Sequence, residues 1–249
     1  MNLTSTPQSK RELLNRYLSL MTGDEKHAPS SISTLDVIQV LYEKVLNYSP
    51  GQIQDEYRDR FFLSKGHGPM AFYAVLALKG YISPEQLETY GEYDSKLGYH
   101  PDRTKLDCVE ISSGSLGHGL PLAIGSIMAL RARGITGPRH WVLMGDAELD
   151  EGSNFEAIPF AGRRGISELN VVVIDNDSST LGWPGGISHR FSIEGWEVSS
   201  VNGRDHDELY RAFTKEHPHK PHAIIATVES KSGLSLIHIS EPTRPLYIS

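Results

Sequence analysis

Acidic side chains follow two short apolar runs of this sequence, in an arrangement that could hold a metal ion. The segment 145–148 (Gly-Asp-Ala-Glu) follows the run 141–144, and the segment 175–177 (Asp-Asn-Asp) follows the run 171–174. Both runs have the length and composition of strands buried in a parallel sheet. The carboxyl ends of such strands share one edge, where ligands bind. The sequence therefore predicts a divalent-cation site at that edge, and a bound cation would attract a phosphorylated ligand.

Asp146 and Asp177 are the expected side-chain ligands, because carboxylate oxygens suit Mg²⁺ or Ca²⁺. Gly145 and Ala147 are small, so backbone amides at the start of the helix expected over 151–164 can approach an anion. Strand, acidic turn, helix and strand then form a βαβ unit. Strand-end acids also cap turns and helices without binding anything, but an acid at each of two strand ends favours the cation site.

The remaining elements predict an α/β fold with three layers, in which a parallel sheet carries helices on both faces. Ser33 is the expected N-cap of one helix, and Gly80 closes another. Helices are expected over 10–20, 34–46, 70–80, 120–133 and 207–217, with a further one beginning at Pro84, and strands over 61–63, 197–202 and 223–228.

Composition limits the class of protein. The 249 residues, 39% of them hydrophobic, suit one large α/β domain. A net charge of −7 disfavours nucleic acid or an anionic membrane surface as the main partner. The single cysteine, Cys108, precludes a disulfide framework, and neither a signal-peptide core nor a membrane-length apolar run is seen. We expect a cytoplasmic protein that binds neither nucleic acid nor membrane.

The last residues are read separately from the domain. From about Leu234 the sequence resembles translated sequencing-adapter read-through rather than a protein domain. We therefore take 1–233 as the domain and leave 234–249 out of the fold prediction as a non-native tail.

Four further segments, in order along the chain, resemble motifs of the N-terminal half of transketolase. Segments 26–33 (Lys-His-Ala-Pro-Ser-Ser-Ile-Ser), 63–68 (Leu-Ser-Lys-Gly-His-Gly) and 98–102 (Gly-Tyr-His-Pro-Asp) are similar to its three histidine loops. Segment 113–119 (Ser-Gly-Ser-Leu-Gly-His-Gly) is similar to its glycine-rich cofactor loop. The segments after the two apolar runs resemble the motif with which this family binds thiamine diphosphate. The resemblance implies the diphosphate-binding domain fold of that family.

The resemblance also implies cofactors and residue roles. Thiamine diphosphate would bind with Mg²⁺, for which Ca²⁺ or Mn²⁺ could substitute, and a two-carbon ketol unit would pass from a ketose donor to an aldose acceptor. Three histidines would line the channel above the cofactor, and two glutamates would join the cofactor sites through an acidic network at a subunit interface. The implied catalytic residues are His27, His67, His100, Glu151 and Glu156; the cofactor-binding residues are His67, Gly114, Ser115, Leu116, Gly145, Asp146, Ala147, Glu148 and Asp177; the metal ligands are Asp146, Asp177 and the carbonyl of Ser179.

A partner follows from the same resemblance. In that family a second, pyrimidine-binding domain activates the cofactor and most groups that recognise sugar phosphates lie beyond the first domain, whereas 249 residues hold no such domain. Either a separate C-terminal transketolase subunit, with the pyrimidine-binding and C-terminal domains, is the expected partner, or the chain is a fragment. Homodimerisation would then give a heterotetramer acting on small sugar phosphates. The implied setting is pentose phosphate metabolism, although the donor need not be an ordinary pentose phosphate.

The sequence departs from the family pattern in places. Ala147 replaces a glycine, Asp177 replaces the usual asparagine, and His118 replaces a glutamine, where it would support the loop. The segment 182–186 (Gly-Trp-Pro-Gly-Gly) is distinctive and indicates a divergent branch. Two alternatives therefore stay open: another thiamine diphosphate enzyme, of the 2-oxoacid dehydrogenase E1 or deoxyxylulose-phosphate synthase type, or a non-catalytic cofactor-binding or regulatory subunit.

Overall fold

A five-stranded, wholly parallel sheet forms the centre of the molecule. The computed structural model describes residues 7–23 and 28–230. The strands are β1 (Arg60–Leu63), β2 (His140–Gly145), β3 (Leu169–Asp175), β4 (Glu197–Asn202) and β5 (His222–Thr227), and they lie in the order β1-β2-β3-β5-β4. All four strand pairs are parallel, as expected from the apolar runs.

The central strands are buried on both faces, which explains their nearly continuous apolar sequence. In β2, Trp141 and Leu143 pack into one hydrophobic cluster, whereas Val142 and Met144 pack into a second cluster on the opposite face. The same alternation continues through β3 and β5. Two layers of helices must therefore cover the sheet, and the expected three-layer α/β fold is confirmed.

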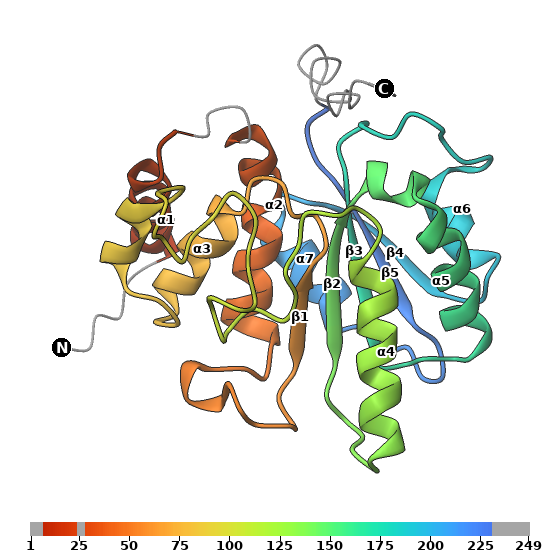
Figure 1. Cartoon of the computed structure of the whole chain (residues 1–249). Helices are drawn as coiled ribbons and strands as arrows, with labels where there is room; N and C mark the ends of the chain where they lie inside the picture. The colour runs from red at the N-terminus through yellow and green to blue at the C-terminus, as the bar shows by residue number, and fades with distance from the viewer. Residues whose placement is uncertain (1–6, 24–27, 231–249) are drawn as a thin grey trace, which may run out of the picture.

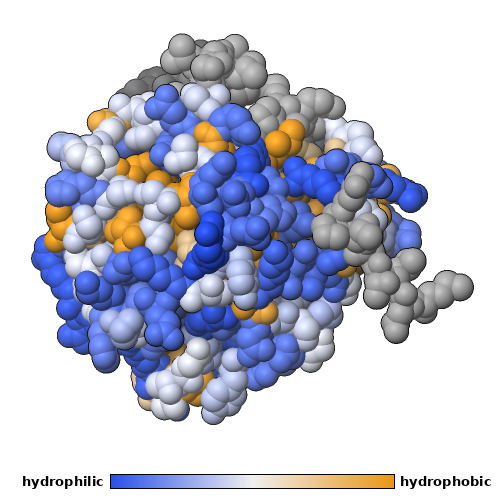
Figure 2. Space-filling model, turned by 180° about the vertical axis from the view of Figure 1, so that it is seen from behind, coloured by the Kyte–Doolittle hydropathy of each residue, from blue (hydrophilic) through white to orange (hydrophobic). Residues whose placement is uncertain are grey.

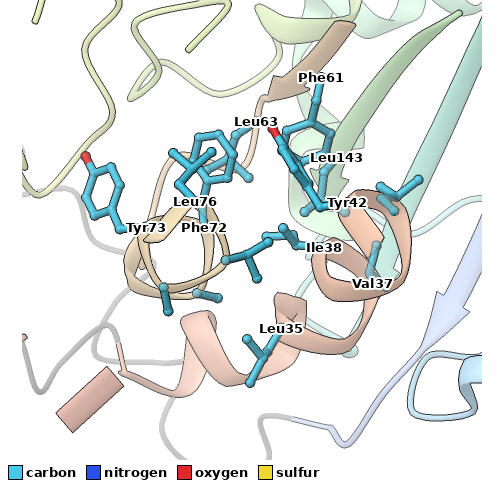
Figure 3. Packing of buried hydrophobic residues seen from close by; sticks show 14 of the residues in the cluster. Leu35, Val37, Ile38, Tyr42, Phe61, Leu63, Phe72, Tyr73, Leu76 and Leu143 are labelled. Carbon is cyan, nitrogen blue, oxygen red and sulfur yellow. The ribbon is translucent and has the colours of Figure 1, made fainter. Parts of the chain in front are cut away.

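One layer of helices is formed largely by the N-terminal part of the chain. It contains α1 (Pro7–Leu20), α2 (Ala28–Val40), α3 (Met70–Leu78) and α7 (His206–Phe213). Figure 3 shows how Ile38 of α2 and Phe72 of α3 meet Leu63 and Leu143 from the sheet. The apolar face of α7 (Leu209, Ala212, Phe213) packs into the same cluster. This layer therefore covers the face of the sheet that carries Leu63 and Leu143.

The other layer consists of α4 (Gly119–Ala132), α5 (Gly152–Arg163) and α6 (Gly186–Ser192). Figure 1 shows these three helices on the side of the sheet opposite to α1, α2 and α3. Ile127 of α4, Ile158 of α5 and Phe191 of α6 belong to the second cluster. A short 3-10 helix, Asp146–Asp150, links the end of β2 to α5. The expected βαβ unit is present.

Several boundaries differ from those expected. Ser33 is not an N-cap: α2 begins at Ala28 and continues through a π-helical turn, Leu41–Val45. The helix expected from Pro84 is a 3-10 helix, Pro84–Thr89, and α7 ends at Phe213 rather than at residue 217. Helix α6, which begins beside Gly185 and Gly186 at positive φ, was not expected at all. A third 3-10 helix, Pro50–Gln52, lies before β1.

The surface is mostly polar. Figure 2 shows the rear face, where hydrophobic patches are separated by charged and polar surface. Among the residues that the structure describes, no helix is both long enough and apolar enough to cross a membrane.

Candidate functional site

The ends of β1, β2 and β3 bring the acidic segments and one histidine loop to a single edge of the sheet. Leu63 pairs with Leu143, and Gly145 pairs with Ile174, so the three strands end at nearly the same level. The segments 64–68, 146–150 and 175–179 therefore leave the sheet side by side. This is the edge at which open parallel sheets bind ligands.

The carboxylate of Asp146 accepts four hydrogen bonds at this edge. Its side chain is buried, and its carboxylate accepts from the amide of Ser178 at 2.6 Å, from the amide of Ser179 at 3.0 Å and from the hydroxyl of Ser178. The amide of Ala147 donates to it at 3.0 Å. Asp146 thus joins the two acidic segments, as the sequence predicted they would meet.

Asn176 and Asp177 differ in where their side chains lie. Asp177 is exposed and has a φ of 59°, in the left-handed region. Asn176 is buried, and its Oδ1 has no hydrogen-bond partner among the described residues. A buried carbonyl oxygen without a donor is costly, and a cation or an added donor would satisfy it. The geometry therefore favours Asn176 over Asp177 as a cation ligand.

Asp150 is a site residue that sequence reasoning missed. Its carboxylate accepts from the hydroxyl of Ser179 at 3.1 Å, the amide of Thr180 at 3.1 Å and the amide of Leu181 at 3.3 Å. Asp146 and Asp150, at the two ends of the 3-10 helix, together hold residues 178–181, which follow β3, against this helix. The sequence signal for Asp150 was a second acid four residues after Asp146, together with the hydroxyl-bearing run 178–180 (Ser-Ser-Thr) later in the chain.

Charge accumulates at this edge. Burial raises the pKa of Asp175, and the nearby carboxylate of Asp146 raises it further. Burial also raises the pKa of Glu148, against the opposing effect of its hydrogen bonds and of Lys65. A divalent cation would offset such a concentration of acids.

Glu148 is buried beneath the edge rather than lining it. Only 1% of its surface is exposed, and its carboxylate accepts from the hydroxyl of Ser64 at 2.6 Å and from the amides of Gly117 and Gly145 at 3.0 Å each. The expectation that Glu148 contacts a cofactor stays a prediction without geometric support, because its acceptor positions face the protein.

The second and third histidine loops meet the glycine loop. The ring centroids of His67 and His100 lie 5.2 Å apart in an edge-on arrangement. A Cβ atom added to Gly66 would lie 2.8 Å from the amide nitrogen of Gly114 and 3.1 Å from Cδ2 of His100. Gly114 has a φ of 135°, and a Cβ atom added to it would lie 3.2 Å from Cδ2 of His100. Only glycine permits this approach, so three segments distant in sequence share one site. His27 lies outside the described residues.

The rest of the glycine loop rests on the start of α5. Gly117 has a φ of 81°, and an added Cβ would lie 2.6 Å from Ser153 Oγ, which donates to the Gly117 carbonyl at 2.8 Å. Ser115 is exposed and Leu116 is half-buried, so both are open to a ligand. The loop then runs directly into α4, whose first residue is Gly119.

Glu151 lies against the glycine loop, where a Cβ atom added to Gly117 would be 2.6 Å from the Cβ of Glu151, and Glu156 lies further along α5. Glu151 is the N-cap of α5, and both carboxylates are exposed. Glu156 borders a groove of about 440 Å³ beside the exposed rings of Phe155 and Phe160. An exposed apolar groove rimmed by charge is typical of a protein–protein contact. The remaining lining residues are Pro159, Arg163 and Arg164.

The described residues hold no group of three or more histidines, cysteines or carboxylates arranged for a metal. A site built from one carboxylate, one amide oxygen and backbone carbonyls does not require such a group. The Asp146 carboxylate and the Asn176 amide oxygen, at the ends of adjacent strands, are donors of that kind. The residues present therefore fit a hard divalent cation, on condition that the Ser178 hydroxyl turns away from Asp146.

Comparison with known proteins places these features in one family. Residues 19–234 match the family described as transketolase, thiamine diphosphate binding domain. A Rhodococcoides fascians protein named ferredoxin fas2 is 53% identical over 224 residues, covering 90% of this chain and 74% of that protein. An apulose-4-phosphate transketolase subunit of Actinobacillus succinogenes is 34% identical over 240 residues, covering 92% of this chain and 87% of that relative.

Solved structures give the same result for the fold. A transketolase of Campylobacter jejuni superposes with a TM-score of 0.70 at 28% identity, covering 91% of this chain and 38% of that enzyme. A transketolase of Leishmania mexicana gives a TM-score of 0.71 at 27% identity, covering 83% of this chain and 37% of that enzyme. The chain thus spans a little over a third of these solved enzymes.

Proposed function

The chain belongs to the transketolase family as a thiamine diphosphate-binding domain, and on this premise we propose that it is the diphosphate-binding half of a split ketol transferase. The observation that carries the proposal is the convergence of His67, His100, the loop at Gly114 and the acid Asp146 on one edge of the sheet. The reaction would move a two-carbon ketol unit from a ketose to an aldose.

The cofactor would be thiamine diphosphate with Mg²⁺. Asp146 and Asn176 would supply side-chain oxygens to the cation; Asp177 and the carbonyl of Ser179, the ligands expected from sequence, stay alternatives. What supports Asn176 is its buried amide oxygen, which lacks a hydrogen-bond donor among the described residues. The bound cofactor would supply the carbanion stabilisation that cleavage of a carbon–carbon bond requires.

The protein's own contribution would be to bind, orient and transfer protons. The backbone around Gly114 would lie against the cofactor, where the absence of a side chain allows close contact. His67 and His100 would donate hydrogen bonds to a ketose carbonyl and its hydroxyls, because imidazole can donate or accept near neutral pH. His27, which lies outside the described residues, stays a prediction in the same role.

A second polypeptide would complete the enzyme. The relative from Actinobacillus succinogenes is named as one subunit of a transketolase, and so is a Clostridium relative at 32% identity. The chain covers most of both, which supports the same organisation here. Exposed Phe155, Glu156 and Phe160 on α5 support a subunit contact on this helix, as the acidic network of the family would require. Small sugar phosphates would be the substrates of the complex.

The Rhodococcoides fascians relative is named as a ferredoxin, a class of iron–sulfur protein, but the residues of this chain do not support such a cluster. An iron–sulfur cluster of the ferredoxin type needs four cysteine thiolates. The chain has one cysteine, Cys108, which is buried.

The test is calorimetric titration of thiamine diphosphate with Mg²⁺ into the chain alone and into its complex with a candidate C-terminal transketolase subunit. A ketol-transfer assay of both samples follows. Metal-dependent binding and transfer only by the complex would support a split enzyme. Binding without transfer in every such complex would favour the non-catalytic alternative. Absence of binding in both samples would contradict the proposal.

A further inference from the structure

Glu148 connects three segments of the proposed cofactor site. Its Oε1 accepts from Ser64, at the start of the loop that carries His67, and from the amide of Gly117 in the glycine loop. Its Oε2 accepts from the amide of Gly145, directly before Asp146. The Ser64 donor is 84 residues away along the chain and the Gly117 donor is 31 residues away. One side chain therefore ties the glycine loop to the ends of β1 and β2, which strand pairing already holds side by side.

The hydrogen bonds extend beyond the first contacts. The hydroxyl of Ser64, while donating to Glu148, accepts from the amide of Gly119 at 3.1 Å. An added Cβ on Gly119 would lie 2.3 Å from that of Ser64, so the start of α4 packs directly on this serine. The side chain of Asn154 donates to the Glu148 carbonyl at 2.6 Å and ties the segment to α5. Glu148 thus lies at the junction of β1, β2, α4 and α5.

Glutamate suits this position better than its neutral analogue. A carboxylate only accepts hydrogen bonds, and its two oxygens can serve three donors that approach from different directions. Glutamine at this position would direct its NH₂ group toward either the amide of Gly145 or the Ser64 hydroxyl and Gly117 amide. Two hydrogen-bond donors would then face each other, and a hydrogen bond would be lost. Hydrogen bonds to an ionised acceptor are also stronger than neutral ones.

We propose that Glu148 is a positioning residue, which holds the glycine loop and the Gly145–Asp146 turn at the separation that the cofactor requires before the cofactor binds. This inference rests on the proposed function and assigns Glu148 a role other than direct contact with the cofactor. Its side chain is 1% exposed, so it acts through the amides of Gly117 and Gly145.

Asp59 provides a matched control. It is also a buried carboxylate that joins distant segments: it accepts from the amide of Asn47 at 3.0 Å and from the amide and guanidinium of Arg139 at 2.8 Å each. It lies immediately before β1, at the amino edge of the sheet, opposite the proposed site. Loss of its charge should lower stability without disturbing the cofactor loops.

The experiment compares Glu148→Gln and Asp59→Asn with the native chain in complex with its partner subunit. After circular dichroism has confirmed folding, thiamine diphosphate is titrated in the presence of Mg²⁺. Glu148→Gln should raise the dissociation constant by roughly tenfold or more, because charge-assisted hydrogen bonds are lost. Turnover at saturating cofactor should stay within about twofold, and Asp59→Asn should bind like the native chain. Equal affinities for the native chain and Glu148→Gln would overturn the proposal.

Amide hydrogen exchange provides a readout that needs no cofactor. In the cofactor-free chain, Glu148→Gln should speed exchange at Gly117 and Gly145 by roughly tenfold or more, and Asp59→Asn should not. If the native complex binds no thiamine diphosphate, the proposed function fails, and the exchange rates still decide whether Glu148 holds the loops. Unchanged exchange at both glycines in Glu148→Gln would contradict that role.

Discussion

Ser178 donates two hydrogen bonds to the carboxylate of Asp146, one from its amide at 2.6 Å and one from its hydroxyl. The amides of Ala147 and Ser179 donate two more. An ionised carboxylate offers about four acceptor positions, so these donors fill them. A cation can reach Asp146 only if a donor leaves, and the Ser178 hydroxyl is the one that a side-chain rotation removes.

Ser178→Ala should therefore strengthen cation binding. With the hydroxyl gone, one acceptor position of Asp146 is open, and the apparent Mg²⁺ affinity should rise by about three- to tenfold. The measurement is the Mg²⁺ dependence of thiamine diphosphate binding to the assembled complex. Ser179→Ala is the control, since that hydroxyl bonds to Asp150 at 3.1 Å rather than to Asp146. Weaker Mg²⁺ binding in Ser178→Ala would show that the hydroxyl assists the cation instead.

Asn176 and Asp177 can be distinguished by substitution. Asn176→Ala removes the buried amide oxygen and should lower Mg²⁺ affinity by about tenfold or more. Asp177→Asn should change it by less than about threefold, because this side chain is exposed and asparagine tolerates a φ of 59°. Manganese titration followed by electron paramagnetic resonance would compare the two variants. The reverse order of effects would restore Asp177 as the ligand.

Stability should fall in acid because of two buried histidines. Burial lowers the pKa of His140 and of His222 to about 3, from 6.5. Between those limits the unfolded chain binds protons that the folded chain does not, so stability is complete above pH 6.5 and decreases as the pH falls toward 3. Each histidine adds up to about 1.4 kcal/mol per pH unit to the slope.

The measurement is urea unfolding between pH 4 and pH 7. His222→Gln keeps a group that can bond to Ser199, which lies 3.0 Å from the imidazole in the native chain, and removes the titration. The slope of unfolding free energy against pH should become shallower, and His140→Gln should add to the effect. A double variant with the native slope would refute this origin of the acid sensitivity.

Phe160→Asp should prevent binding of the partner subunit without unfolding the chain. The ring is 41% exposed beside the groove on α5, so a carboxylate there would be hydrated in the free chain and desolvated in an interface. Analytical ultracentrifugation with the partner subunit should show a smaller assembly. Tyr93→Asp, at a ring that is 97% exposed, is the control. An unchanged assembly in Phe160→Asp would remove the groove from the proposed contact.

Two glycines should respond to alanine in opposite ways. Gly125 lies within α4 with open space around it, so Gly125→Ala should stabilise the chain by about 0.5–1 kcal/mol. Gly66→Ala would bring a methyl group to 2.8 Å from the amide nitrogen of Gly114, and should cost about 1–3 kcal/mol and weaken cofactor binding. Thermal unfolding of both variants checks the signs. A neutral Gly66→Ala would mean that the loops at Gly66 and Gly114 separate easily.

The sequence predicted the fold well where a signal was local. The apolar runs at 141–144 and 171–174 became β2 and β3, and the helix expected over 151–164 became α5. The prediction of Ser33 as an N-cap was wrong. Its hydroxyl instead accepts a hydrogen bond from Lys65 at 2.8 Å inside the protein, which the rules for N-caps do not anticipate. Helix α6 was missed because two glycines mark its start, and glycine normally indicates a turn.

The candidate site was predicted in outline and not in detail. Motif resemblance and strand-end acids correctly placed Asp146 at the sheet edge with the second acidic segment. Burial was not readable from sequence, so the sequence did not show that Asn176 is buried and Asp177 exposed; Asp177 as a metal ligand stays a prediction. The sequence marked Asp150 only as a second acid after Asp146. The hydrogen bonds of Asp150 and Glu148 could not be anticipated, because their donors lie up to 84 residues away and are brought together only by the fold.

The bond between Glu148 and Ser64 also has a consequence for the order of events during synthesis. Its partners are 84 residues apart, and the segment that covers Asp146 is made later still, at Ser178 and Ser179. A nascent chain therefore lacks the complete set of hydrogen bonds around Asp146 until about three quarters of the chain has been translated. Two crossover connections must also have closed, which is the slow part of folding parallel sheets. Thiamine diphosphate would then bind only the folded domain. Its binding would raise the melting temperature by mass action without speeding folding.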